Sequence, residues 1–295
     1  MKENDTLRRF VFERANVRGA FIHLDATWRA LLERKEYPEP VANQLGRFMA
    51  AGALLSSTIK FEGSLIMQIQ SKGPISMLVV EATSERTLRG TAKWDESTES
   101  LSESTSYSEL FSQGQLVLTI DSGNSQDRYQ GIIELEGGSL AETLEAYFIR
   151  SEQLETQVWL SVSGQSATGM LIQKMPGGED YDQDAWNRIQ TLAGTVTDQE
   201  LTNLSAMENI QRLFAEEDVR LFDGEPVSFR CSCSRERVSN MLRTLGIDEV
   251  HGIIDEQGSV SVNCEYCSQE YVFDKVDAEA LFAASIPTEV PKTRH

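Results

Sequence analysis

The sequence has 295 residues, of which 40% are hydrophobic and 25% charged. This length exceeds the usual size of one domain, and the composition excludes a wholly disordered or fibrous chain. The 27 Lys and Arg stand against 46 Asp and Glu, which gives a formal net charge of −19. Because so acidic a surface repels phosphate backbones and anionic lipid, we expect no general binding to nucleic acid or to membranes.

No segment of the sequence has the features of a membrane anchor. The longest stretch of purely apolar or small residues, 48–55, is far too short to cross a bilayer. The first ten residues, MKENDTLRRF, lack the apolar core of a signal peptide. We therefore expect a cytoplasmic protein.

The region up to about residue 175 alternates between strand and helix patterns. Residues 65–70 and 75–80, on either side of Gly73-Pro74, predict a hairpin with one face more apolar than the other. Several strands are joined by short turns that contain glycine, which favours antiparallel pairing. The other predicted strands are 17–24, 88–94, 115–120, 129–135, 157–162 and 169–174.

Three helices are expected among these strands. Asp25 is the predicted cap of the first helix. The second, residues 41–56, is apolar or small nearly all round, so we expect it to be buried beneath or between sheets. The third begins at a predicted capping box, in which Glu142 follows Ser139 by three residues.

A run of Pro and Gly at residues 176–178, followed by acidic residues, marks a boundary. The segment after it is predicted to be mostly helical, and Thr197 with Glu200 forms another capping box. Such a helix is marginally stable alone and needs a surface to dock on. The side chains expected to form its apolar face are Leu201, Leu204, Met207, Ile210, Leu213 and Phe214.

All four cysteines follow residue 230, as Cys231-Ser-Cys233 and Cys264-Glu-Tyr-Cys267, in a region with two short helix patterns and a strand pair. Four thiolates in two close pairs are typical of a closed tetrahedral zinc site. We therefore predict one Zn²⁺ per chain. Three arginines, Arg230, Arg235 and Arg237, surround the first pair, and we expect their charge to lower the thiol pKa values.

The two pairs differ in how easily each could form a disulfide. Cα atoms two residues apart in an extended chain lie about 6.6 Å apart, near the upper limit for a disulfide, so a Cys231–Cys233 bond needs a bent loop. Cysteines three residues apart across a turn, such as Cys264 and Cys267, have Cα atoms within about 7 Å and bridge more easily. We therefore expect the Cys264–Cys267 pair to oxidise first.

Other functions remain open at this point. The zinc could simply hold a small domain together, the second pair could be the centre of a thiol-disulfide oxidoreductase, and the region could be a nucleic-acid-binding zinc ribbon, which the overall charge opposes. Hydrolase chemistry has little support, because His23, His251 and His295 show no metal or triad spacing and no phosphate-binding loop is present. We expect no catalytic site and no enzyme activity.

Recognisable motifs occur along nearly the whole chain, at residues 17–19, 37–38, 73–75, 88–90, 128–131, 147–153, 169–173, 229–237 and 264–267. The most specific motif is the Ser-Arg-Glu-Arg run that follows the first cysteine pair. In these motifs the chain resembles one family, the redox-regulated holdase chaperone of bacteria known as the heat-shock protein of thirty-three kilodaltons.

The resemblance implies an ATP-independent chaperone that is inactive when reduced and zinc-bound. Oxidation would form disulfides within each pair, Cys231–Cys233 and Cys264–Cys267, release zinc and unfold the linker. The reduced form would be a monomer and the oxidised form a homodimer. The oxidised form would then hold unfolding client proteins until ATP-driven foldase chaperones take over.

Taken together, these patterns predict an α+β fold with mostly antiparallel sheets around a buried helix, a helical linker and a small C-terminal zinc domain with four cysteine ligands. The expected organisation is a chaperone core at 1–177, a metastable linker at 178–228, a zinc-binding redox-switch domain at 229–286 and a tail at 287–295. We further hypothesise that the apolar face of the linker covers an apolar surface of the core in the reduced state.

Overall fold

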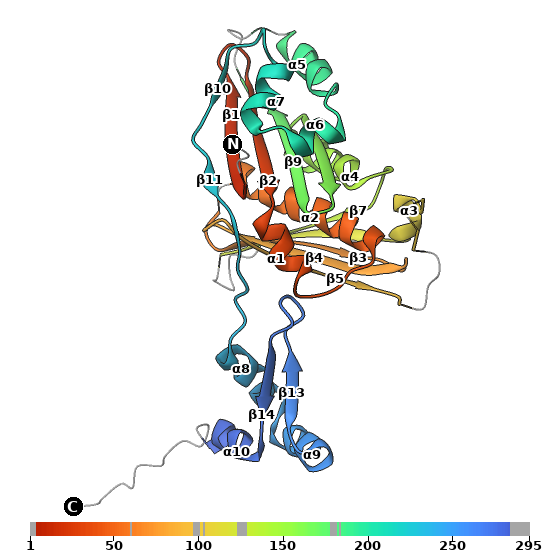
Figure 1. Cartoon of the computed structure of the whole chain (residues 1–295), viewed down its shortest axis with the longest axis vertical. Helices are drawn as coiled ribbons and strands as arrows, with labels where there is room; N and C mark the ends of the chain where they lie inside the picture. The colour runs from red at the N-terminus through yellow and green to blue at the C-terminus, as the bar shows by residue number, and fades with distance from the viewer. Residues whose placement is uncertain are drawn as a thin grey trace, which may run out of the picture. The chain divides into compact units, whose positions relative to one another are not determined.

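The computed structural model describes residues 4–59, 61–96, 101–102, 104–122, 129–177, 182 and 184–283. Contacts divide the chain into two compact units, Met1–Arg230 and Cys231–His295. Helices combined with largely antiparallel sheets make the fold α+β, as expected (Figure 1). The predicted tail, 287–295, lies outside the described residues, as do residues 178–181 and 183 at the predicted start of the linker.

The described residues of the first unit form two six-stranded sheets. In the first sheet the strands run in the order β10-β1-β2-β9-β8, with β11 also paired to β1, and in the second sheet the order is β12-β5-β4-β3-β6-β7. Within the described residues, every pairing in these sheets is antiparallel except that of β12 with β5. The bounds are β1 Thr6–Phe12, β2 Val17–Leu24, β3 Ser64–Gln70, β4 Ile75–Thr83, β5 Thr87–Trp94, β6 Gln115–Asp121, β7 Tyr129–Glu134, β8 Thr156–Ser163, β9 Ser166–Lys174, β10 Val219–Leu221, β11 Glu225–Pro226 and β12 Ser228–Phe229.

Strand β1 was not predicted from the sequence, although it lies inside the first sheet. Its two adjacent arginines break the alternation of apolar and polar residues, yet Phe10 and Phe12 are buried. Phe10 pairs with Gly19 of β2, where a Cβ atom would lie only 2.2 Å from the Phe10 ring. A glycine at this position therefore makes room for the aromatic ring across the strand pair.

Helix α2, Glu39–Thr58, lies between the two sheets (Figure 1). It contacts β2, β8 and β9 of the first sheet and β3, β4 and β5 of the second. Most of its residues from Leu45 to Ser56 are buried, because a helix that is apolar all round can lose contact with water on every side. The predicted buried helix is thus observed, and it forms the centre of the larger apolar core.

The cap of helix α1, Ala26–Leu32, differs from the prediction. The Asp25 side chain makes no capping hydrogen bond. Instead the carboxylate of Asp5 accepts from the backbone N–H groups of Asp25, Ala26 and Thr27, at 3.2, 2.9 and 2.7 Å. The true cap is therefore distant in sequence, because strand pairing brings Asp5 to the start of the helix.

The remaining helical elements of this part of the chain are α3, Tyr107–Leu110, α4, Leu140–Tyr147, and a π-helical turn at Phe148–Glu152. Ser139 caps α4 by accepting a hydrogen bond from the backbone N–H of Glu142. The predicted capping box is incomplete, because the Glu142 carboxylate accepts from the backbone N–H of Gly138 and not from that of Ser139.

Three helices cover the face of the first sheet opposite α2 (Figure 1). They are α5, Ala185–Ala193, α6, Asp198–Asn203, and α7, Ala206–Leu213. The predicted capping box of Thr197 and Glu200 is present at α6. The sequence predicted one continuous helix from there, but the chain turns extended at Leu204, and Ser205 with Glu208 forms a second capping box that starts α7.

The segment of residues 219–230, which we call the strap, pairs with both sheets. Its strands β10 and β11 lie against β1, and β12 lies against β5. The backbone N–H groups of Val227, Ser228 and Arg230 donate to the carbonyls of Asp5, Arg86 and Leu88 at 2.8, 3.1 and 3.0 Å. The strap is thus hydrogen-bonded to the rest of the first unit as far as Arg230, the last residue of that unit.

The second unit is small. It consists of α8, Arg235–Leu245, α9, Ile247–Gln257, the hairpin β13, Val260–Asn263, and β14, Glu270–Phe273, and α10, Lys275–Ala283. Its described part therefore has three helices where the sequence suggested two. Its buried apolar side chains are Leu242, Val250, Ile254, Val260, Phe273, Ala278 and Leu281.

Among the described residues, no helix is both long enough and apolar enough to cross a membrane.

Candidate metal centre

The first cysteine pair lies in the extended segment that leads into α8. Helix α8 begins at Arg235, two residues after Cys233, and its N-cap is Ser234, whose side chain accepts a hydrogen bond from the backbone N–H of Arg237 at 3.2 Å. A Ser N-cap fixes where the helix starts and so fixes the direction in which the chain enters it. The two cysteines therefore lie just before the N-terminus of the helix and not within it.

The second pair lies at the tip of the hairpin formed by β13 and β14. The backbone N–H of Cys264 donates to the Gln269 carbonyl at 2.9 Å, and the N–H of Ser268 donates to the Cys264 carbonyl at 2.8 Å. Ser268 has a φ of 55°, which lets the chain reverse after Cys267. The turn expected around these cysteines is thus present, and its two ends lie on paired strands. A redox-active C-x-x-C motif usually opens a helix instead.

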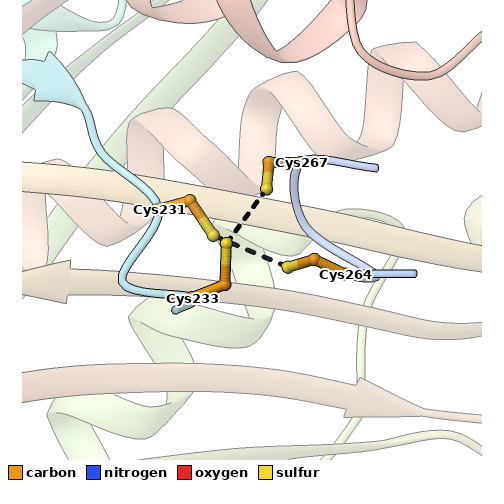
Figure 2. Close-up of side chains that lie close together, drawn as sticks. All are labelled: Cys231, Cys233, Cys264 and Cys267. Atoms are coloured by element: carbon orange, nitrogen blue, oxygen red, sulfur yellow. Dashed lines mark hydrogen bonds between the residues drawn. The ribbon is translucent and has the colours of Figure 1, made fainter. Parts of the chain in front are cut away.

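The four sulfur atoms converge on one point (Figure 2). The Sγ atoms of Cys231 and Cys264 lie 3.6 Å apart, those of Cys233 and Cys267 lie 3.4 Å apart, and all four lie within 4.8 Å of one another. Sulfur ligands about 2.3 Å from a central zinc ion are about 3.8 Å apart at the corners of a tetrahedron. The cluster therefore has the size and the donor set of a zinc site with four thiolate ligands.

The cysteines are free thiols in the structure and are half-buried. Burial opposes ionisation, but hydrogen bonds from Cys233, Cys267 and Cys264 outweigh it at Cys231 and lower its pKa to about 7. At Cys264 and Cys267 burial dominates and raises the pKa. One member of the cluster is thus readily ionised in the metal-free form, and a bound cation would favour the thiolate at the others.

The predicted influence of the three arginines is not observed. The guanidinium of Arg230 forms an ion pair with Glu85 at 3.5 Å, and that of Arg237 donates to the Ser232 hydroxyl at 2.6 Å. In the first pair, on which these arginines were expected to act, the pKa of Cys231 is lowered, but the cause is hydrogen bonding from the Cys233 backbone and from the neighbouring thiols, and not arginine charge.

Arg235 connects the start of α8 to the rest of the small unit. Its guanidinium donates to the Val272 carbonyl at 2.9 Å, pairs with Asp277 at 2.8 Å and stacks over the Phe273 ring at 4.2 Å. These contacts join α8, the helix that follows the first cysteine pair, to β14 and α10. Arg235 therefore stabilises the scaffold around the cysteines.

Comparisons with known proteins agree with this arrangement. Residues 5–274 match the sequence model of the family described as "Hsp33 protein". The chain belongs to the Hsp33 family. It is 48% identical to the "33 kDa chaperonin" of Methylobacillus flagellatus and 49% identical to that of Nitrosococcus oceani, with complete coverage of both chains in each case.

The fold has a solved counterpart at lower sequence similarity. The crystal structure of a 33 kDa chaperonin from Thermotoga maritima, a heat shock protein 33 homolog, superposes with a TM-score of 0.81 at 21% identity, covering 95% of this chain and 99% of the other. The resemblance expected from the sequence motifs is thereby confirmed at the level of the family. Relatives of this chain are named as chaperones.

The six residues predicted to form an apolar face do not all lie in the same environment. Leu201, Ile210, Leu213 and Phe214 are buried in the second apolar cluster of the first unit, against the first sheet. Leu204 is only half-buried, and Met207 is 43% exposed. Met207 therefore does not belong to the packed face, because the break at Leu204 and Ser205 rotates α7 relative to the single predicted helix.

The surface that these helices cover was not identified from the sequence. It consists of apolar side chains on the outer face of the first sheet, two of which are aromatic rings that approach the ring of Phe214. Phe214 lies 4.9 Å from Phe12 and 6.4 Å from Phe10, measured between ring centroids. The sheet residues in this cluster are Phe10, Phe12, Val17, Phe21, Met170 and Ile172.

The histidines do not contribute to the metal centre. His23 is buried, and its Nε2 lies 3.2 Å from the Asp25 carboxylate. His251 lies on α9, and His295 lies outside the described residues. Within the described part of the chain, the four cysteines form the single group of metal-ligating side chains with this geometry.

Proposed function

We propose that this chain is a redox-regulated, ATP-independent chaperone that is inactive while its cysteines are reduced and hold zinc. The observation that carries the proposal is the convergence of the four sulfur atoms within 4.8 Å in a chain of the Hsp33 family. Cys231, Cys233, Cys264 and Cys267 would be the ligands. Zinc, when bound, would close the site and tie the segment before α8 to the hairpin tip.

Oxidation would destroy this ligand set. In each pair, two thiolates would lose two electrons to an oxidant and form a disulfide, Cys231–Cys233 or Cys264–Cys267, and a disulfide sulfur is a poor metal ligand. In the described part of the second unit, the apolar core has seven buried side chains, which is too few to stabilise a domain of this size by itself. The second unit is therefore expected to unfold when its thiols are oxidised.

Unfolding of the second unit would then loosen the strap, which is continuous with it. Strand β12 pairs with β5 over only two residues, Ser228 and Phe229. Once the chain beyond Arg230 is unfolded, fraying of this short pairing costs little, since each lost hydrogen bond is replaced by one to water. Residues 178–228 would act as the metastable linker in this scheme.

Release of the linker would expose the outer face of the first sheet. Phe10, Phe12 and Phe21 of this face are buried under α5–α7 in the structure. An exposed apolar surface of this kind binds unfolded chains, whose own apolar side chains are accessible. We propose that unfolding or oxidatively damaged client proteins bind here and on the released apolar residues of the linker.

The remaining features of the proposal follow from the family resemblance. The reduced form would be a monomer in the cytoplasm, and the oxidised form a homodimer. Bound clients would pass to ATP-driven foldase chaperones after reduction of the disulfides.

One experiment tests this function. Zinc content, free thiols and suppression of client aggregation are measured together on the full chain, before and after exposure to hydrogen peroxide at raised temperature. We expect about one zinc per chain and no holdase activity before oxidation, and zinc loss with activity after it. Constant activity with retained zinc would leave only a structural role for the metal, and catalytic turnover of a disulfide substrate would favour an oxidoreductase.

A further inference from the structure

The phenol of Tyr271 is hydrogen-bonded to one sulfur of the cysteine cluster. Tyr271 lies on β14, where it pairs with Val262 of β13, and its hydroxyl donates to the Sγ atom of Cys233 at 3.2 Å. The same sulfur lies 3.4 Å from that of Cys267. The hydroxyl thus reaches across from the hairpin that carries the second cysteine pair to a member of the first pair.

A hydrogen bond to a ligating sulfur has two physical effects. It holds the sulfur in one orientation, as other partners of metal ligands do. It also draws electron density away from the sulfur, which makes a thiolate a weaker nucleophile towards an oxidant. Both effects protect Cys233 while the strand β14 keeps the ring in place.

We propose that Tyr271 is a positioning residue that holds Cys233 in the cluster and makes the Cys231–Cys233 pair the slower of the two pairs to oxidise. This inference rests on the proposed redox function and adds a residue that sets the order of its steps. Since Tyr271 is on the hairpin, its hydrogen bond lasts only while the hairpin is folded. Oxidation of Cys264 and Cys267, which lie at the tip of that hairpin, would therefore remove the protection of the first pair.

The chemical step that Tyr271 slows is the attack of Cys233 on hydrogen peroxide. The thiolate sulfur takes one oxygen as the O–O bond breaks, which gives a sulfenic acid and hydroxide. The Cys231 thiolate then displaces a second hydroxide from that sulfur and forms the S–S bond. Overall, two thiolates are oxidised by two electrons, one peroxide is reduced, and the two hydroxide ions take up two protons to form water.

The test compares the zinc-loaded full chain with the variant Tyr271→Phe, which lacks the hydroxyl and keeps the ring. Graded hydrogen peroxide is followed by alkylation of free thiols and peptide mass mapping, and zinc release is recorded with a chromogenic chelator. In molecules whose Cys264 and Cys267 are still reduced, we expect the Cys231–Cys233 pair to oxidise about three- to tenfold faster in the variant, the range of one hydrogen bond. The Cys264–Cys267 pair in the same molecule should keep its rate.

A matched control makes the same chemical change outside the site. Tyr129 lies on β7 of the first unit and is 50% exposed, and Tyr129→Phe should leave the oxidation of the first pair unchanged. Substitution of cobalt for zinc adds a spectroscopic readout that a purely structural role would not alter. Loss of the phenol hydrogen bond should move the sulfur-to-cobalt charge-transfer band of Tyr271→Phe to lower energy.

A second variant covers the case in which Tyr271→Phe does not retain metal. Site-specific 3-fluorotyrosine at position 271 keeps the ring and strengthens the donor, so the first pair should oxidise more slowly than in the wild type. Wild-type rates and an unchanged cobalt spectrum in both variants would overturn the role of Tyr271. If the wild type bound no zinc, or kept its zinc after oxidation, the proposed redox function itself would be wrong, whatever the role of Tyr271.

Discussion

Asp5 contacts two separate parts of the first unit, the start of α1 and the strap. Its carboxylate accepts from the backbone N–H groups at the start of α1, and its carbonyl accepts from Val227 of the strap at 2.8 Å. Its φ of 53° is tolerated by Asp better than by most residues. A single acidic side chain thus stabilises a helix start that has no local cap.

The substitution Asp5→Ala removes this cap. We expect the first unit to lose about 0.5–2 kcal/mol of its free energy of unfolding, the usual cost of a lost N-cap. Asp5→Asn is the control, because its amide oxygen can still accept a backbone hydrogen bond and should restore most of the loss. Urea denaturation followed by tryptophan fluorescence measures both. Equal losses of unfolding free energy in the two variants would show that Asp5 does not stabilise the first unit by accepting these backbone hydrogen bonds.

The capping glutamates of α6 and α7 make the docked helices sensitive to acid. Hydrogen bonds to Thr197 and Ser205 lower the pKa values of Glu200 and Glu208 below their usual 4.5. A carboxylate whose pKa is lower in the folded state stabilises that state above its unfolded pKa. This stabilisation is lost as the pH falls through the folded value.

We therefore expect α5–α7 to detach from the first sheet more readily below about pH 4 than at pH 7. Binding of a fluorescent apolar dye as a function of pH measures the exposure of the sheet face. The double variant Glu200→Gln with Glu208→Gln should flatten the acid part of this profile, since it has no carboxylates to protonate at the two caps. An unchanged profile would assign the acid sensitivity to other groups.

At the scale of elements, α7 presents two contrasting surfaces. Ile210 is buried against the first sheet and only 6% exposed, while Met207, one turn earlier, is 43% exposed. Burial of an aliphatic side chain of this size is worth roughly 1.5–3 kcal/mol. The docking of α7 thus depends on a few side chains that can be tested one at a time.

Replacement of Ile210 by Gln should undock the helix in part and give the reduced, zinc-bound chain a measurable holdase activity. Replacement of Met207 by Gln is the matched control on the same helix and should leave the reduced chain inactive. Suppression of aggregation of a thermally unfolding client is the measurement, with zinc content recorded to show that the cysteine cluster is intact. If both variants remain inactive and compact, docking through this face does not control activity.

At the scale of the whole molecule, the two units differ in how they are stabilised. The first has a large core around α2 and a second core under α5–α7. The second unit has few buried side chains and a cluster of thiols that could bind a metal. Removal of a structural metal from such a unit is equivalent to removal of much of its folding free energy.

A zinc chelator under reducing conditions should therefore unfold the second unit and leave the centre of the first intact. Hydrogen exchange followed by mass spectrometry should show fast exchange for the amides of β13 and β14. The amides of α2 should keep the slow exchange of a buried helix. Slow exchange in both units after complete zinc removal would mean that the small core alone is sufficient.

The net charge of −19 also acts at this scale. A chain that exposes a large apolar face is prone to self-association, and mutual repulsion between acidic surfaces opposes it. In the proposed function, the acidity would keep the oxidised form dispersed while its apolar face is accessible to clients.

The sequence by itself determined the features that depend on local patterns. The spacing of the four cysteines, the apolar helix at residues 41–56 and most strands of the two sheets are visible in short windows, since each depends on neighbouring residues. The family could be recognised from motifs for the same reason.

The tertiary structure decided the features that depend on residues far apart in the chain. Strand β1 is buried only because β2 and the distant strap pair with it, Asp5 caps α1 from outside the helix, and Tyr271 reaches Cys233 across 38 positions. The exposure of Met207 differs, because the Ser205–Glu208 capping box that breaks the apparently continuous apolar pattern is itself local. The three long-range contacts arise only when the elements pack together, so no local pattern in the sequence contains them.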